Sequence, residues 1–187
     1  MAGDERIRLF CALELPEQAG SELAAWQTRH LPAKPPGLRV VPPEHLHVTL
    51  AFLGSRPASE LQQIAHELRE AAAAAGGVRL QAERYRETQS VGMIVYVDLG
   101  GAGAALAADL GERLERLGVY RPERSAWMPH VTVARFRERP RLTPTPPVLG
   151  EISPSDAAVY SSVLRPSGSH YHVLERAELG ERNTGGR

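Results

Sequence analysis

The sequence predicts an α+β fold with mainly antiparallel sheets. Three segments place apolar residues at helical spacing, and they lie among about eight runs whose composition is typical of strands. Several of these strands follow one another as hairpins and do not alternate strictly with helices, which favours antiparallel sheets. The chain has 187 residues and no long linker between elements, so we expect one domain over residues 1–179 and a flexible tail at 180–187.

The first half of the chain contains regular patterns of both kinds. Residues 6–14 form an apolar run that ends before Pro16, which predicts a buried strand. Residues 17–30 place Leu23 and Trp26 on one helical face after an acidic first turn, so we expect a helix there. The other elements expected in this half are a short strand at 38–41, a strand at 45–53 and a helix at 58–75.

The second half is expected to begin and end with a hairpin. Two strand-like runs around a polar turn precede a helix whose leucines lie on one face and which Gly118 closes. A further strand and a proline-rich connection follow. These elements are expected at 78–87 and 91–99 for the first hairpin, 102–117 for the helix, 127–136 for the strand, 140–147 for the connection, and 159–164 with 170–175 for the last hairpin.

Composition and charge exclude several classes of protein. Lys+Arg and Asp+Glu both number 22, so no overall basic field exists to bind long nucleic acids nonspecifically. Hydrophobic residues make up 42% of the chain, which argues against disorder, and no apolar run approaches the length of a membrane span. The single cysteine, Cys11, and the charged first residues lead us to expect a soluble protein of the reducing cytoplasm.

The strongest functional signal is a short phrase that occurs twice. The two copies are Leu-His-Val-Thr-Leu-Ala at 46–51 and Pro-His-Val-Thr-Val-Ala at 129–134. Side chains two apart in a strand share a face, so His47 projects together with Thr49, and His130 together with Thr132. Each copy therefore presents one imidazole and one hydroxyl, and two related lobes could bring both pairs to a single cleft.

Two imidazoles and two hydroxyls around one group are suited to the cleavage of a phosphate ester. One neutral imidazole would remove a proton from the attacking water, while an opposed imidazolium would protonate the leaving oxygen. The hydroxyls of Thr49 and Thr132 would donate hydrogen bonds to phosphate oxygens, where negative charge builds up in the transition state. This chemistry requires no metal ion or other cofactor, and we predict none.

Two other interpretations of the histidines explain less of the pattern. A single histidine on a strand is more often structural, but the repetition of the whole phrase argues against that role. A metal site could use the His-x-His pairs formed by His45 with His47 and by His170 with His172. Such a site would leave His130 and both threonines unexplained, and neither pair has a close acidic partner.

The motifs resemble those of the two-histidine phosphoesterase superfamily, in particular its RNA 2′,3′-cyclic phosphodiesterase branch, also called the 2′-5′ RNA ligase family. The similarity covers nearly the whole chain, at residues 8–13, 44–54, 129–135 and 160–174. It implies a bilobal fold with pseudo-twofold symmetry, two sheets flanked by helices, and a cleft between the lobes. The implied activity is metal-independent hydrolysis of RNA or nucleotide 2′,3′-cyclic phosphates to 2′-phosphomonoesters.

The resemblance also implies roles for individual residues. His47 would be the general acid toward the O3′ leaving atom, and His130 would be the base for water. Arg135 matches an arginine expected near the phosphate, although strand alternation turns it away from His130 unless the strand ends or bulges, and a surface role is the alternative. Phe10 matches an aromatic residue near the cleft, which could stack on a nucleobase or belong to the core.

The expected substrates are RNA 3′ ends or nucleotides that carry a 2′,3′-cyclic phosphate. We expect a monomer with no obligate protein partner and no membrane association. Two alternative functions stay open: a module that binds RNA or nucleotides without turnover, and an RNA ligase that runs the reverse reaction through the same histidines as a secondary activity.

Overall fold

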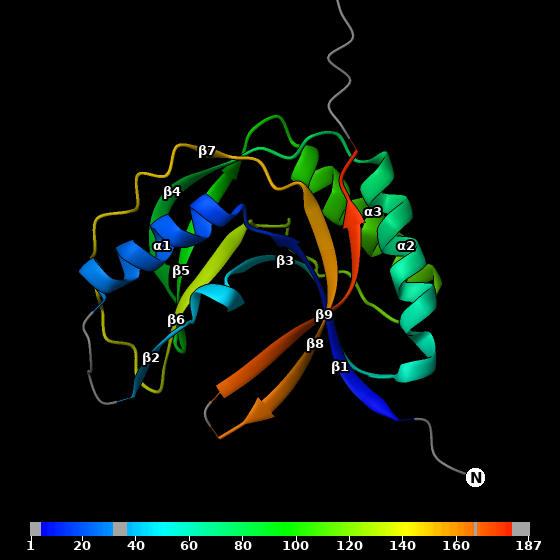
Figure 1. The fold of residues 1–187 in the computed structure, drawn as a ribbon, viewed down its shortest axis with the longest axis horizontal. Helices are drawn as coiled ribbons and strands as arrows, with labels where there is room; N and C mark the ends of the chain where they lie inside the picture. Colours follow the sequence, from blue (N-terminus) through cyan, green and yellow to red (C-terminus); the bar gives the residue numbers. More distant parts are fainter. Residues whose placement is uncertain (1–4, 32–36, 167, 181–187) are drawn as a thin grey trace, which may run out of the picture.

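The computed structural model describes residues 5–31, 37–166 and 168–180, and it confirms the α+β fold (Figure 1). Its helices are α1 (Glu17–His30), α2 (Leu61–Ala74) and α3 (Ala102–Arg116), with short 3-10 helices η1 (Pro43–His45) and η2 (Ala58–Glu60). Its strands are β1 (Arg6–Glu14), β2 (Leu38–Val40), β3 (His47–Pro57), β4 (Leu80–Glu87), β5 (Val91–Asp98), β6 (His130–Phe136), β7 (Glu151–Ile152), β8 (Asp156–Arg165) and β9 (Gly168–Glu178).

Within the described residues, the strands form one nine-stranded antiparallel sheet. Its order is β7-β4-β5-β6-β3-β1-β8-β9, and β2 also pairs with β6. The expectation of two separate sheets is therefore wrong, because β3 and β6 join the two halves through Val48 opposite Val131. Each half contributes one copy of the histidine phrase to this seam, so the join between the halves is also where the two motifs meet.

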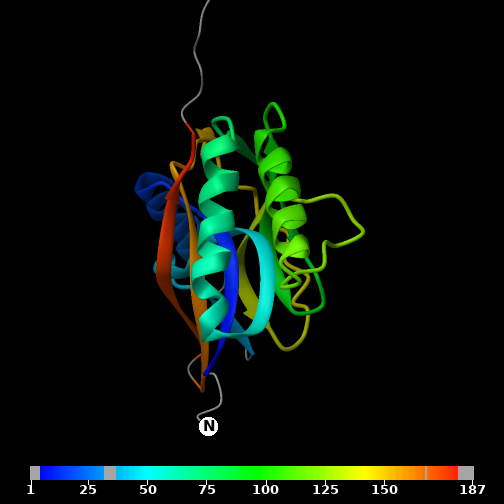
Figure 2. The same cartoon turned by 90° about the vertical axis from the view of Figure 1, so that its right-hand side faces the viewer.

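The helices cover the sheet in two places. Figures 1 and 2 show α2 and α3 side by side against the sheet, with α1 over the half that contains β4 to β6. The face of α3 that carries Leu106, Leu110 and Leu114 is buried, as the spacing of its leucines predicts. In α1, Leu23 and Trp26 are buried in the same way. Helical periodicity therefore identified the core-facing sides of both helices.

Some elements differ from the sequence-based expectation. The second helix begins at Leu61, because the residues directly after Pro57 form the 3-10 turn η2, a common start of a helix. The strand β7 was not expected, since two residues are too short to show an alternating pattern; its Ile152 pairs with Leu80 of β4.

The end of the described chain is attached to the fold. The backbone NH of Leu179 donates to the carbonyl of Ser155, and that of Gly180 donates to the carbonyl of Ala72. The expected flexible tail therefore does not include Gly180, and its other residues, 181–187, lie outside the described residues. None of the described helices combines the length and the apolar character needed to cross a bilayer.

Candidate active site

The pairing of β3 with β6 places four predicted site residues on one face of the sheet. In an antiparallel pair, the residues that flank a matched position face each other in reverse order. At the valine pair that joins the halves, this register places His47 beside Thr132 and Thr49 beside His130. The two motifs are therefore related by a local twofold axis between the strands, as their repetition suggests.

A bulge in β6 brings an arginine to the same face. Val133 and Ala134 are buried one after the other, and the register against β5 slips by one residue between Thr132 and Ala134. The extra residue reverses the alternation, so Arg135 faces the same pocket as Thr132. The strand thus bulges at the position where simple alternation would have turned Arg135 away from His130.

The strand β3 repeats this bulge at the same distance from its histidine. Leu50 and Ala51 are buried in succession, the register against β1 slips beside them, and the burial pattern matches that of β6. The residue that returns to the pocket is Phe52, five positions after His47. The sequence interpretation missed Phe52, although the spacing that drew attention to Arg135 applies to it as well.

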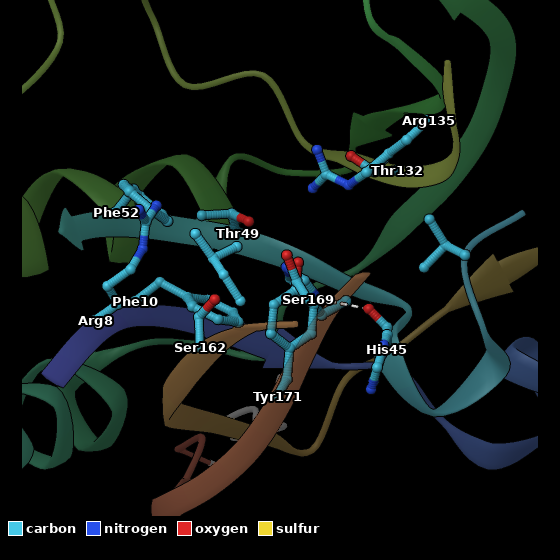
Figure 3. Close-up of a pocket in the computed structure, with 13 residues that line it drawn as sticks. Arg8, Phe10, His45, Thr49, Phe52, Thr132, Arg135, Ser162, Ser169 and Tyr171 are labelled. Atoms are coloured by element: carbon cyan, nitrogen blue, oxygen red, sulfur yellow. Dashed lines mark hydrogen bonds between the residues drawn. The ribbon is translucent and has the colours of Figure 1, made fainter. Parts of the chain in front are cut away.

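These side chains line an open pocket of about 410 Å³, a size typical of small-molecule sites (Figure 3). The lining residues are Arg8, Phe10, Val41, His45, His47, Thr49, Phe52, Thr132, Arg135, Ser162, Leu164, Ser169 and Tyr171. Five of the six residues predicted for the site belong to this lining; the sixth, His130, is not one of the lining residues, although the β3–β6 register places it beside Thr49. No Asp or Glu among the described residues lines the pocket, which favours an anionic ligand.

Both histidine rings are oriented by the same kind of hydrogen bond. Nδ1 of His47 donates to the carbonyl of His45 at 2.7 Å, and Nδ1 of His130 donates to the carbonyl of Met128 at 2.9 Å. A carbonyl oxygen only accepts, so each Nδ1 carries a hydrogen, and each Nε2 is the atom that can take or give a proton. The two rings are thus prepared for proton transfer through equivalent atoms.

The surroundings of the two rings differ. Aromatic side chains enclose His47, with ring centroids at 4.8 Å for Phe10, 5.4 Å for Tyr171 and 5.9 Å for Tyr160. Burial, with smaller contributions from Arg135 and neighbouring histidines, lowers the pKa of His47 to about 4, although the backbone hydrogen bond opposes this shift. In the free protein at neutral pH, His47 is therefore an uncharged imidazole.

Phe10 is part of the wall behind His47. It is only 2% exposed, and its ring stacks on Tyr160 at 4.9 Å and contacts the edge of Tyr171 at 5.1 Å. Of the two roles considered for Phe10, packing is the one that this burial supports, because neither face is free for a base. By contrast, the ring of Phe52, which also lines the pocket, is 52% accessible.

Two side chains that do not line the pocket donate hydrogen bonds to the backbone at and near the motif strands. The amide of Gln27, which is buried, donates to the carbonyls of Val133 and Val41 at 2.9 Å each. Nε1 of Trp127 donates to the carbonyl of Thr49, also at 2.9 Å. These bonds restrain the backbone where the bulge in β6 and the first threonine must keep their positions.

The metal interpretation lacks a ligand set in the part of the chain that the structure describes. No group of three or more His, Cys, Asp or Glu side chains there is arranged to hold a metal ion. His45 approaches His170 with ring centroids 6.0 Å apart, and it lines the pocket next to Tyr171. Figure 3 shows His45 on the side of the pocket away from Phe52.

The fold and the paired motifs define a class of protein, the two-histidine phosphoesterases. Comparison with known proteins agrees with this class: the family model "LigT like Phosphoesterase" matches residues 13–90. An RNA 2′,3′-cyclic phosphodiesterase of Thermus thermophilus is 32% identical over 92% of this chain and 90% of its own. A protein of the same name from Escherichia coli is 26% identical over 94% of this chain and 98% of its own. The chain belongs to the LigT-like phosphoesterase family.

Solved structures extend the comparison to the fold. A crystal structure from Thermus thermophilus is 31% identical, with a TM-score of 0.78 over 92% of this chain and 98% of that chain. Escherichia coli LigT complexed with 3′-AMP is 23% identical, with a TM-score of 0.79 over 94% of this chain and 99% of that chain, and supports the fold alone. The family membership makes this protein a hydrolase with phosphoesterase activity.

Proposed function

We propose that the protein hydrolyses 2′,3′-cyclic phosphates at RNA 3′ ends or on nucleotides to 2′-phosphomonoesters without a metal ion. The observation that carries this proposal is the meeting of the two histidine–threonine motifs where β3 pairs with β6, next to a pocket that His47, both threonines and Arg135 line. Three relatives are named RNA 2′,3′-cyclic phosphodiesterase, which supports the choice of substrate.

The proposed reaction is an in-line displacement at phosphorus. The oxygen of a water molecule bonds to phosphorus while the bond from phosphorus to O3′ breaks, and the phosphate stays on O2′. Nε2 of His130 takes a proton from the water, and Nε2 of His47 gives a proton to O3′. The two histidines finish with exchanged protonation states, and proton exchange with solvent restores them.

Three further side chains stabilise the charge that develops during this step. The hydroxyls of Thr49 and Thr132 and the guanidinium of Arg135 donate hydrogen bonds to the phosphate oxygens that are not displaced. The ring of Phe52 is exposed in the same pocket, so we assign it the role of stacking on the nucleobase. Such stacking is worth about 1–3 kcal/mol. Phe10 acts in this scheme by packing against His47.

The acid role of His47 requires a proton that the free protein does not hold at neutral pH. We expect the pKa of His47 to rise from about 4 when adenosine 2′-monophosphate binds, because the nearby anion stabilises the imidazolium. NMR titration of the ring signals with and without the ligand measures this change. Adenosine without phosphate is the control and should not raise the pKa. A His47 that stays neutral at pH 6 in the complex would instead give the acid role to His130.

The function is tested with 2′,3′-cyclic AMP in the presence of EDTA. We expect turnover that the chelator does not change, and a single product that phosphorus NMR identifies as adenosine 2′-monophosphate. Tight binding without product would favour a binding module, and loss of turnover with EDTA would contradict metal independence. End-labelled RNA halves with 2′-phosphate and 5′-hydroxyl ends measure the secondary ligase activity in the same preparation.

A further inference from the structure

The pocket has a second arginine that the proposed reaction does not use. Arg8 lies in β1, opposite Ser55 of β3 on one side and Ser162 of β8 on the other. Its guanidinium lies over the ring of Phe52, with 5.5 Å between Cζ and the ring centroid. Figure 3 shows Arg8, Phe52 and Ser162 grouped together, away from Arg135 and Thr132. The pocket therefore has two cationic regions, and the exposed ring of Phe52 lies at the one that contains Arg8.

Arg8 is the arginine near Phe52 that has no acidic or backbone partner in the described part of the chain. Arg6, two residues earlier, donates to the carbonyl of Ser55 at 2.6 Å. Arg56 forms a pair with Glu60, with nitrogen–oxygen distances of 2.7 and 3.0 Å. By contrast, the contact with Phe52 leaves the hydrogen-bond donors of Arg8 available, and no carboxylate among the described residues lines the pocket to neutralise it.

The donors around Arg8 repeat those of the reacting phosphate site. There, Arg135 acts with two threonine hydroxyls; here, Arg8 lies next to the hydroxyl of Ser162, which also lines the pocket. A guanidinium with a neighbouring hydroxyl is a common way to bind phosphate oxygens. A nucleoside 2′,3′-cyclic phosphate has a single phosphate, so it leaves this second set of donors unused.

We propose that Arg8 and Ser162 form a second phosphate subsite, which binds the phosphate on the 5′ side of the nucleotide that reacts. This inference rests on the proposed function and deepens it. The preferred substrates are then RNA 3′ ends and 5′-phosphorylated nucleoside 2′,3′-cyclic phosphates, above cyclic nucleotides with a free 5′-hydroxyl. The terminal base stacks on Phe52, and the guanidinium of Arg8 leaves the ring to contact the phosphate.

The test compares three substrates that differ at the 5′ position of the reacting nucleoside. They are 2′,3′-cyclic AMP, its 5′-phosphorylated form, and the dinucleotide ApA with a terminal 2′,3′-cyclic phosphate. We expect both substrates with a 5′-side phosphate to have about tenfold higher kcat/KM than 2′,3′-cyclic AMP, as one charge-assisted contact provides. The gain should appear mainly in KM and shrink with added salt, because binding at this site is remote from the bond that breaks.

Variants of Arg8 test whether this side chain causes the preference for substrates with a 5′-side phosphate. In Arg8→Gln, kcat/KM for substrates with a 5′-side phosphate should be within about twofold of that for 2′,3′-cyclic AMP. Arg8→Lys should retain part of the preference, since lysine keeps the charge but lacks the planar guanidinium. The control is Arg39→Gln, which removes another exposed arginine that does not line the pocket and should keep the wild-type preference.

The outcomes separate this inference from the proposed function. If wild-type protein hydrolyses 2′,3′-cyclic AMP but shows no preference for a 5′-side phosphate, the subsite is wrong and the function stands. An equal loss on all three substrates in Arg8→Gln would also overturn the subsite. If none of the three substrates is hydrolysed, the proposed function itself fails.

Discussion

Replacement of either His47 or His130 by alanine should lower the turnover of 2′,3′-cyclic AMP by about 10²–10⁴-fold, the usual contribution of one general acid or base. Each ring presents Nε2 for proton transfer because its Nδ1 donates to a carbonyl, so neither ring can replace the other. Steady-state rates with EDTA present measure the effect. The double variant should lose much less than the product of the two single losses, since both rings act in one step.

His66→Ala is the matched control for these variants. His66 is exposed on α2 and is not part of the pocket, so its replacement should leave the rate within about twofold of wild type. Circular dichroism spectra establish that each variant is folded. A folded His47→Ala or His130→Ala protein with the wild-type rate would refute the paired-histidine mechanism.

Arg135→Gln should reduce kcat/KM for 2′,3′-cyclic AMP by about 10–100-fold, because a hydrogen bond to a charged group is worth about 1.5–3 kcal/mol. The bulge in β6 directs this side chain into the pocket beside Thr132, where the phosphate is proposed to bind. If the contact strengthens in the transition state, kcat falls together with kcat/KM.

Arg137→Gln provides the comparison for this variant. Arg137 lies two residues further along the chain, is exposed, and does not line the pocket, although it carries the same charge. We expect it to retain the wild-type kcat/KM on this small substrate. Equal losses in Arg135→Gln and Arg137→Gln would mean that general attraction of the anion, and no specific phosphate contact, explains the effect.

The position of Arg135 shows where prediction from the sequence reached its limit. Strand alternation is a local rule, and it holds from His130 to Thr132. The rule fails at Val133, because this strand has one extra residue there relative to β5. The sequence of β6 alone does not show how the strand is aligned with β5. The same bulge in β3 explains why Phe52 was overlooked.

The aromatic residues that enclose His47 could not be predicted from the sequence either. Two of its members, Tyr160 and Tyr171, come from the hairpin of β8 and β9, more than a hundred residues after the histidine. The motif copies look alike in the sequence, yet burial among these rings lowers the pKa of His47 in the fold. The chemical difference between the two copies therefore depends on a distant part of the chain.

The sequence by itself determined the positions of most helices and strands, including β1 and α1 with their bounds, and it determined the two histidine–threonine pairs. These features depend on the period of apolar residues and on neighbours a few positions away, and both are present in the sequence of each segment. Only the tertiary structure decided that the halves share one sheet, that the motifs face each other across Val48 and Val131, and that His47 is enclosed by aromatic rings. Register and burial arise from contacts between segments far apart in the chain, so they exist only once the chain has folded.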